Sequence, residues 1–313
     1  MRQKREKFAK TLHGSERIEP KIEVFKVSPR EKGQRLLAFL REKCPDAPSV
    51  KALKRSIEGK LCRINGKIET FSTHILKAGD TVEIEIDREA HVRPKPLLLW
   101  EDDVLAAYDK PAGVVCEPKA FPGKLVHRLD KETSGVVLVA KNGKILEQMI
   151  ELFREKKVRK EYLAIVDGLV RDKKKVISSK LASIHHFQGQ TMYGSSSSGQ
   201  EAITEWELIG VGTKSSLLLC KPITGRTHQL RVHLKEAGHP IVGDYHYAKV
   251  FQSPYEAKRH LLHAHKICFP HPITHREIEV IAPLPPDFVE ALETLGMAHL
   301  LEYYTQGISK FGF

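Results

Sequence analysis

The chain has 313 residues, of which 41% are hydrophobic and 29% are charged, a composition that excludes a disordered protein and fits a globular one. Its length suits a small domain followed by a larger one. The net charge of +12 predicts an anionic partner such as nucleic acid. Residues 1–90 hold most of that surplus, with 21 Lys and Arg against 14 Asp and Glu.

The five cysteines are Cys44, Cys62, Cys116, Cys220 and Cys268. They are scattered and form no Cys-x-x-Cys pair, so we expect reduced thiols in a cytoplasmic protein rather than a disulfide framework. No apolar run follows the basic N-terminus as it would in a secretory signal, and none is long enough to span a membrane. We expect a monomer that makes no membrane contact.

Residues 1–21 are polar and basic, and we expect a loose arm there, either a solvated tail or an RNA contact. Compact patterning then begins. A first, short helix is predicted whose apolar face comprises Leu36, Leu37, Phe39 and Leu40. A second helix is predicted from Ser49, a favourable N-cap, to Gly59, which suits the position just after a helix.

The second helix has an apolar and a basic side. Its apolar positions are Val50, Leu53 and Ile57. Its cations, spaced to share one surface, are Lys51, Lys54 and Arg55. Clustered positive charge suits the phosphates of RNA, and a solvated helix face is an equally open interpretation.

Asn65-Gly66 between apolar stretches predicts a hairpin, because both residues of such a turn adopt positive φ. Residues 81–86 alternate apolar and polar side chains, as a half-buried strand does. The stretches GQRLLAFL, SVKALKRSIEGKLCRINGK and AGDTVEI resemble the RNA-binding module named after ribosomal protein S-four. The resemblance implies that residues 22–90 form a small α/β RNA-binding module.

Residues 91–100 contain prolines and are interpreted as a linker. Residues 101–295 are predicted to form an α+β domain with a mixed, mostly antiparallel sheet, because apolar runs of strand length recur with few long helices between them. Ser195–Ser198 predicts a flexible loop, and residues 296–313 a C-terminal tail. The clearest helix follows Asn142, with inward side chains at Ile145, Leu146, Met149, Ile150 and Phe153.

The segment His127-Arg128-Leu129-Asp130 lies just before the apolar run GVVLVAK. An Asp followed by Thr, Ser and Gly usually bonds its own backbone, and spacing alone favours that interpretation. The loop position before a strand, with Arg128 and His127 adjacent, indicates instead a cationic functional site around Asp130.

A second cluster lies in the segment PITGRTHQLRVH, residues 222–233. We expect a helix over residues 227–237, with Arg226 beside its start and His228 and Arg231 on its early turns. Cations there oppose the helix dipole, so they are poorly placed for stability and well placed to meet phosphates or a carboxylate.

Histidine is frequent, with 16 in the chain. His263 and His265 on one strand would share a face, as two zinc ligands would. We find no third ligand at a suitable spacing, so structural histidines are the favoured interpretation and we expect no metal site.

Three segments resemble the signature segments of RluA-type pseudouridine synthases: DKPAGVVCEP (109–118), HRLDKETSGVVLVAK (127–141) and PITGRTHQLRVHLKEAGHPIVGDYHYA (222–248). KEYLAIV (160–166) and RHLLHAHKICFPHP (259–272) are similar to further segments of that family, in the expected order. The resemblance implies a pseudouridine synthase catalytic domain. It outweighs the turn-forming interpretation of Asp130.

The resemblance also implies roles for single residues. Asp130 is the essential carboxylate, Arg231 pairs with it, and Tyr162 stacks against the target base. Arg128 displaces the target uridine and holds its place in the RNA. Supporting or RNA-contacting residues are His127, Arg226 and His228.

Pseudouridine formation breaks the N-glycosidic bond of uridine, turns the uracil and rejoins it through carbon. A carboxylate acts on the ribose either as a nucleophile or as a base, and both roles stay open. The reaction is redox-neutral, and the chain has neither a Walker loop nor a dinucleotide fingerprint, so we expect no cofactor. The span 114–126 is short for the family and the loop GDYHYA departs from its usual pattern, which leaves the RNA contacts open.

Large-subunit ribosomal RNA is the expected partner, because the front module beside this type of catalytic domain suggests it, and transfer RNA is the alternative. Two competing hypotheses belong to other functional classes. One is a non-catalytic RNA-binding or ribosome-assembly protein, and the other is a metal hydrolase that uses the histidines.

Overall fold

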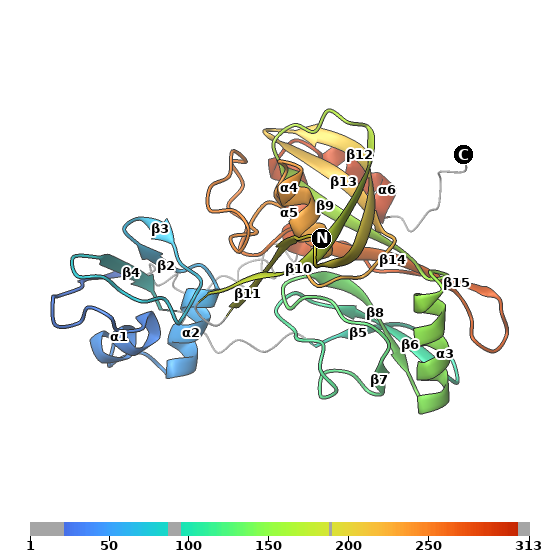
Figure 1. Ribbon diagram of the computed structural model, residues 1–313, viewed down its shortest axis with the longest axis horizontal. Helices are drawn as coiled ribbons and strands as arrows, with labels where there is room; N and C mark the ends of the chain where they lie inside the picture. The colour runs from blue at the N-terminus through green and yellow to red at the C-terminus, as the bar shows by residue number, and fades with distance from the viewer. Residues whose placement is uncertain (1–21, 87–94, 188–189, 306–313) are drawn as a thin grey trace, which may run out of the picture. The chain divides into compact units, whose positions relative to one another are not determined.

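The computed structural model describes residues 22–86, 95–187 and 190–305 (Figure 1). The chain divides into two compact units, residues 1–89 and 90–313. The predicted arm, residues 1–21, lies outside the described residues. In the part of the chain that is described, no helix is long and apolar enough to cross a membrane.

The first unit is an antiparallel sheet in the order β1-β4-β2-β3, with two helices packed on it. The predicted hairpin is confirmed, because Asn65 and Gly66 both have positive φ, 52° and 75°. The elements are β1 (Ile22–Lys26), α1 (Leu36–Lys43), α2 (Val50–Glu58), β2 (Cys62–Ile64), β3 (Lys67–Ile68) and β4 (Thr81–Glu85).

Helix α2 begins at the predicted cap, since the Ser49 hydroxyl accepts a hydrogen bond from the Ala52 amide at 3.1 Å. The three cations of α2 are exposed, as an RNA-contacting face requires. The prediction that Val50 is on the apolar face is wrong, because its side chain is 44% exposed at the edge of the buried stripe. That stripe comprises Ala52, Leu53, Ser56 and Ile57.

The second unit is built on one mixed sheet, in the order β11-β10-β12-β13-β9-β14-β8-β6-β5, with β15 paired to β14 and β7 to β8. Among the described strands only β14 and β8 pair in parallel, so the predicted α+β class with a mostly antiparallel sheet is confirmed. The strands are β5 (Leu97–Glu101), β6 (Leu105–Lys110), β7 (Lys124–Leu125), β8 (Ser134–Ala140), β9 (Arg159–Asp167), β10 (Lys174–Phe187), β11 (Gln190–Ser195), β12 (Gln200–Gly212), β13 (Ser215–Pro222), β14 (Leu262–Pro270) and β15 (Glu277–Ile281).

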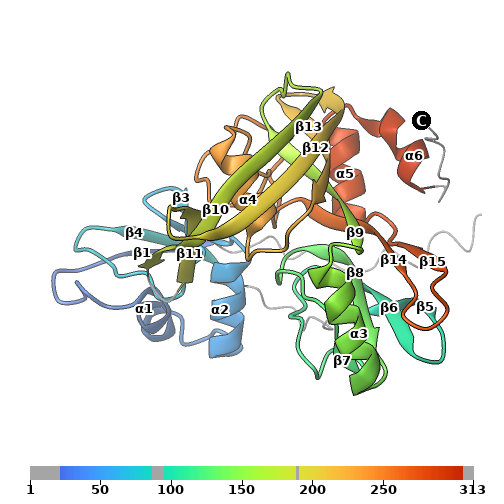
Figure 2. The same cartoon turned by 45° about the vertical axis from the view of Figure 1, so that its right-hand side comes forward.

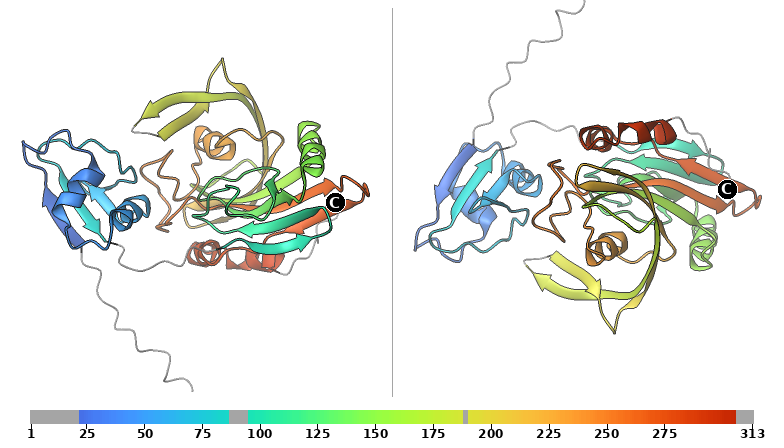
Figure 3. Two further views of the ribbon diagram at one scale, coloured as in Figure 1. Left: turned by 90° about the horizontal axis from the view of Figure 1, so that it is seen from below. Right: turned by 90° about the horizontal axis from the view of Figure 1, so that it is seen from above.

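The helices of this unit cover both faces of the sheet. The sheet curves around α4, which contacts β11, β12 and β13 on the concave side (Figure 3). Helices α5 and α6 lie on the other face (Figure 2). Because both faces are covered, every residue of β8 is buried, which explains its unbroken apolar run. The helices are α3 (Gly143–Arg154), α4 (Gln229–Glu236), α5 (Pro286–Thr294), the 3₁₀ turn η1 (Ala298–Leu300) and α6 (Leu301–Thr305).

Several boundaries differ from the prediction. The linker assigned to residues 91–100 is too long, because Leu97–Glu101 pair with β6 as β5. The C-terminal tail from residue 296 is partly structured, since Met297 and Leu300 are buried in the core. Residues 195–198, predicted as a flexible loop, form the end of β11 and a turn closed by a hydrogen bond from the Gly199 amide to the Ser196 carbonyl.

Two helix predictions also need correction. Helix α3 is capped by Asn142 as expected, but Ile150 is 42% exposed, because the buried side of the helix is centred on Ile145 and Met149. Helix α4 starts two residues later than predicted, at Gln229, because His228 has a left-handed conformation with φ of 57°.

Candidate active site

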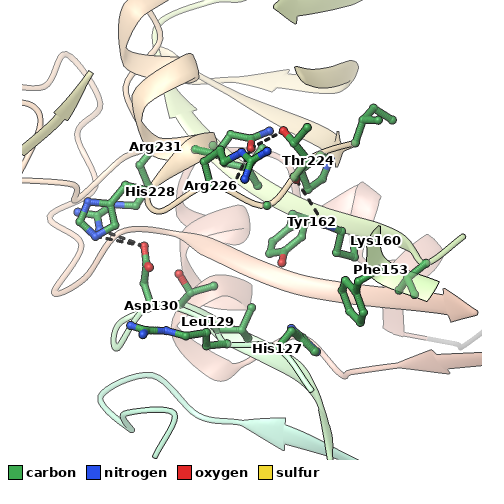
Figure 4. Close-up of a pocket in the computed structure, with 18 of the residues that line it drawn as sticks. His127, Leu129, Asp130, Phe153, Lys160, Tyr162, Thr224, Arg226, His228 and Arg231 are labelled. Atoms are coloured by element: carbon green, nitrogen blue, oxygen red, sulfur yellow. Dashed lines mark hydrogen bonds and ion pairs between the residues drawn. The ribbon is translucent and has the colours of Figure 1, made fainter. Parts of the chain in front are cut away.

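A cavity of about 540 Å³ opens in the second unit where β9, the loop before β8 and the start of α4 meet (Figure 4). These segments are far apart in sequence and brought together by the sheet. The site residues predicted in this unit all line the cavity: His127, Arg128, Asp130, Tyr162, Arg226, His228 and Arg231. The remaining predicted contacts, the cations of α2, belong to the first unit.

A buried lysine, Lys110, holds the loop that carries Asp130 through hydrogen bonds to backbone carbonyls. The Lys110 ammonium donates to the carbonyls of Pro111, Val114 and Lys131 at 2.8–3.0 Å. Burial of this group lowers the pKa of Lys110 to about 8. Three backbone acceptors therefore hold a cation whose removal would release the loop on which Asp130 is mounted.

The side chain of Asp130 is bonded across the cavity, whereas its backbone carbonyl accepts from the Thr133 amide of its own turn at 3.1 Å. Its Oδ2 accepts a hydrogen bond from Arg231 Nη1 at 3.1 Å, from a residue 101 positions later in the chain. This contact contradicts the interpretation that the Asp130 carboxylate bonds its own backbone. The Asp130 side chain keeps 27% of its surface exposed, so a substrate can reach it.

Arg231 is shared between two carboxylates. Its Nε and Nη2 donate to the two oxygens of Asp244 at 2.7 Å and 2.8 Å, and this carboxylate is almost fully buried. The bidentate pair fixes the guanidinium plane and directs the remaining Nη1 towards Asp130. Asp244 therefore positions the arginine, and Asp130 is the carboxylate that faces the cavity.

The charges of the cavity keep Asp130 ionised. Burial alone would raise its pKa, but the adjacent Arg231 guanidinium holds the pKa of Asp130 below its ordinary value. The same guanidinium holds the pKa of the more deeply buried Asp244 well below the usual range. A carboxylate in this state can serve as a nucleophile or as a base at neutral pH.

His228 approaches Asp130 as a neutral ring. Burial, and next Arg231, lowers the pKa of His228 to about 4, so its Nε2 at 3.8 Å from Asp130 Oδ2 does not form an ion pair at neutral pH. The Tyr247 hydroxyl lies 2.7 Å from His228 Nδ1 and also accepts from the Tyr193 amide at 3.3 Å. A hydroxyl that donates to Nδ1 leaves the ring proton of His228 on Nε2, facing Asp130.

Tyr162 and Lys160 project from the same side of β9 into the cavity (Figure 4). Tyr162 offers an aromatic ring beside Asp130, and burial, with Asp130 nearby, raises the pKa of its phenol well above the ordinary value. Tyr162 therefore does not serve as a proton donor or acceptor at neutral pH. Its ring is left to make a planar contact with a nucleobase.

The predicted supporting residues behave differently from one another. Arg128 is exposed and has no ion pair or hydrogen bond with any residue in the described ranges. The expectation that His127 adds positive charge is wrong, because burial lowers its pKa to about 3 and its Nε2 accepts from the Leu138 amide at 3.0 Å. Arg226 holds the start of β12 by donating to the Glu201 carbonyl at 2.9 Å and to Gln200 at 2.8 Å.

The histidines considered as metal ligands have other partners. His263 Nδ1 lies 3.0 Å from the Ser134 hydroxyl, and His265 Nδ1 lies 3.1 Å from the Ala282 carbonyl. Burial lowers the pKa of His263 to about 3 and that of His265 to about 4. Within the described residues no three His, Cys, Asp or Glu side chains gather as metal ligands do.

Comparison with known proteins agrees with this geometry. The family model described as RNA pseudouridylate synthase matches residues 104–236. Ribosomal large subunit pseudouridine synthase C of Haemophilus ducreyi is 31% identical over 304 residues, covering 85% of this chain and 93% of that one. Synthase D of Haemophilus influenzae is 30% identical, with 88% and 95% covered. The chain belongs to the RluA-type pseudouridine synthase family.

A solved structure supports the same assignment. Human RNA Pseudouridylate Synthase Domain Containing 1 has 27% sequence identity and a TM-score of 0.57, covering 65% of this chain and 90% of that chain. Members of the family are isomerases that act on RNA. The pseudouridine synthase activity therefore replaces the competing hypotheses of a non-catalytic binding protein and a metal hydrolase.

Sequence reasoning missed part of the pseudouridine synthase site. Asp244, in the loop GDYHYA, was not predicted as the second partner of Arg231. Gln229 was also missed, although its side chain links the site loop to β12: Oε1 accepts from the Arg226 amide at 3.0 Å and Nε2 donates to the Ile203 carbonyl at 2.9 Å. A buried arginine needs more than one acceptor, and this is the signal that would have pointed to a second carboxylate.

Proposed function

We propose that this pseudouridine synthase isomerises specific uridines in large-subunit ribosomal RNA, in the cytoplasm and as a monomer, with Asp130 as its essential carboxylate. The observation that carries the proposal is the ion pair between Asp130 and the buried Arg231 at the wall of the cavity. The names of the similar synthases C and D supply the RNA class.

Asp130 acts on the ribose of the target nucleotide. Its ionised carboxylate either attacks the sugar or removes a proton from it, and either step weakens the bond between N1 of the uracil and C1′. Arg231 remains neutralised by Asp244 throughout, so a change in the charge of Asp130 does not leave the guanidinium without a partner.

Tyr162 and Arg128 handle the flipped nucleotide. A base that reacts at its glycosidic bond has to leave the stack, and an aromatic ring in the pocket compensates for the stacking it loses. Tyr162 offers such a ring beside Asp130. Arg128 is exposed on the same loop, without an intramolecular partner in the described ranges, and fills the gap in the RNA.

The first unit supplies affinity rather than chemistry. We assign residues 22–90 to an RNA-binding module of the S-four type, preceded by a basic arm over residues 1–21 and followed by a catalytic domain that runs from β5 to α6, residues 97–305. The exposed cations of α2 suit a phosphate backbone, which rewards clustered charge without base contacts.

The test is a direct assay of the purified chain on two RNA classes. Unmodified large-subunit ribosomal RNA and a pool of unmodified transfer RNAs are incubated separately, and pseudouridine is mapped by a chemistry that labels it at single positions. The proposal predicts discrete, stoichiometric sites in the ribosomal RNA. Pseudouridine sites confined to transfer RNA would contradict the proposal and identify transfer RNA as the substrate.

A further inference from the structure

Lys160 is a cation in the wall of the cavity with little to compensate its charge. Its Nζ lies 3.4 Å from the Thr224 carbonyl, and no carboxylate of the described chain pairs with it. The Phe153 ring lies 5.8 Å from the same nitrogen. Burial lowers the pKa of Lys160 to about 8, so the group is charged at neutral pH at a cost to stability.

The position of Lys160 on β9 indicates which part of the reacting nucleotide it faces. Lys160 and Tyr162 are two residues apart on β9, so their side chains point to the same side, roughly 6.5 Å apart along the strand. Tyr162 lies between Asp130 and Lys160 (Figure 4). If Asp130 faces the ribose and Tyr162 the uracil ring, Lys160 faces the edge of the ring that is remote from the sugar.

We propose that Lys160 is a catalytic residue whose ammonium donates a hydrogen bond to the uracil carbonyl remote from the ribose and stabilises the uracil anion that leaves C1′. This inference deepens the proposed function and rests on its placement of the ribose at Asp130. Lys160 would then interact with the leaving uracil, while Asp130 acts on the ribose.

The electron balance of the reaction shows where such a partner acts. When the N1–C1′ bond breaks, its electron pair stays on the uracil and spreads over O2 and O4. The new bond forms between C5 and C1′, C5 then loses its proton, and N1 gains one. A cation beside a carbonyl oxygen stabilises the separated uracil more than the bound uridine, which is what accelerates the step.

A single lysine suits both the substrate and the product. The uracil exchanges N1 for C5 by a half-turn about the line through N3 and C6, and this turn also exchanges O2 and O4. The carbonyl remote from the sugar is therefore O4 in uridine and O2 in pseudouridine. A donor at that position keeps a carbonyl partner before and after the turn, whereas the amino group of cytosine would oppose it.

Binding of a backbone phosphate is the other role open to a lysine. The exposed Arg154 and Lys156 at the rim of the same cavity suit that role better, because phosphates of a flipped nucleotide remain near solvent. Lys160 is recessed between Phe153 and the Thr224 carbonyl. The two roles are separated by whether the substitution of Lys160 changes affinity or rate.

The experiment uses the full chain, an RNA that carries its target uridine, and three variants. K160M removes the charge and retains the volume, K160R retains the charge, and K144M removes an exposed lysine on α3 as a matched control. Activity of the wild-type chain on the RNA is measured first, so that an inactive wild type refutes the proposed function and not this inference.

We expect the single-turnover rate of K160M at saturating RNA to fall about 100-fold, with RNA affinity and its salt dependence unchanged. The melting temperature of K160M should be equal or higher, since a costly buried charge is removed. The wild-type rate should decline above about pH 8 as Lys160 loses its proton, and K160R should retain its rate there. K144M should match wild type in every measurement.

A substrate carrying 4-thiouridine at the target position tests the contact itself, because sulfur accepts a hydrogen bond from an ammonium more weakly than oxygen. The thio substitution should slow the wild-type chain and leave K160M unaffected. Two results would overturn the inference: an unchanged rate in a folded K160M, or a loss of RNA affinity with the rate at saturation preserved, which would assign Lys160 to a phosphate.

Discussion

The two carboxylates that share Arg231 should separate catalysis from stability. Asp130 makes one contact with the guanidinium, at 3.1 Å, and is 27% exposed, whereas Asp244 makes two, at 2.7 Å and 2.8 Å, and is 2% exposed. Replacing each by Asn changes one charge and almost no volume. The pair D130N and D244N is therefore matched in chemistry and differs in position.

The expected magnitudes follow from this geometry. D244N leaves a buried arginine without its main partner, which costs about 3–5 kcal/mol and lowers the melting temperature by at least about 6 °C for a domain of this size. D130N breaks one part-exposed contact while Arg231 stays neutralised by Asp244, so it costs about 1 kcal/mol or less. Its turnover should fall about 10⁴-fold or more, because the reacting carboxylate is removed.

The assay combines thermal unfolding with single-turnover pseudouridine formation at saturating RNA, at a temperature where both variants are folded. D130N should retain RNA affinity. Two results would contradict these roles: a D130N melting temperature as far below wild type as that of D244N, or a single-turnover rate of D244N lower than that of D130N.

Three further outcomes are expected. Y247F, which removes the hydroxyl hydrogen-bonded to His228 Nδ1, should slow single turnover about tenfold without weakening RNA binding, and an unchanged rate would show that the ring orientation is unimportant. Because the pKa of Asp130 is lowered, the rate should not fall through carboxyl protonation between pH 7 and pH 5, and a midpoint near pH 6 assigned to Asp130 would contradict the ion pair. The triple variant K51Q/K54Q/R55Q should lower the slope of log affinity against log salt by about 2–3 with the saturated rate retained, whereas an equal slope would leave α2 a solvated helix face.

Local signals predicted much of the fold. The Ser49 and Asn142 caps, the Asn65-Gly66 turn and the apolar run of β8 are all encoded within a few residues, and each is confirmed. Errors arose where distant contacts decide the outcome. The strand β5 lies beyond the prolines of the expected linker and is defined by its pairing with β6.

The site shows the same division. The resemblance in motif predicts Asp130, Tyr162 and Arg231 as site residues, and the structure brings them to one cavity. The sequence pattern does not predict Asp244 or Lys160. Neither the second acceptor of a buried arginine nor the missing partner of a buried lysine is visible in a linear pattern. His127 was misjudged for a related reason, since burial decides its charge and not its neighbours in sequence.

The most direct test of the central claim is a pseudouridine map of the RNA of a host that lacks this gene, complemented with either the wild-type chain or D130N. We expect discrete sites in large-subunit ribosomal RNA that appear with the wild-type chain and are absent with an equal amount of D130N. Identical maps from the two strains would contradict the claim that Asp130 is the essential carboxylate.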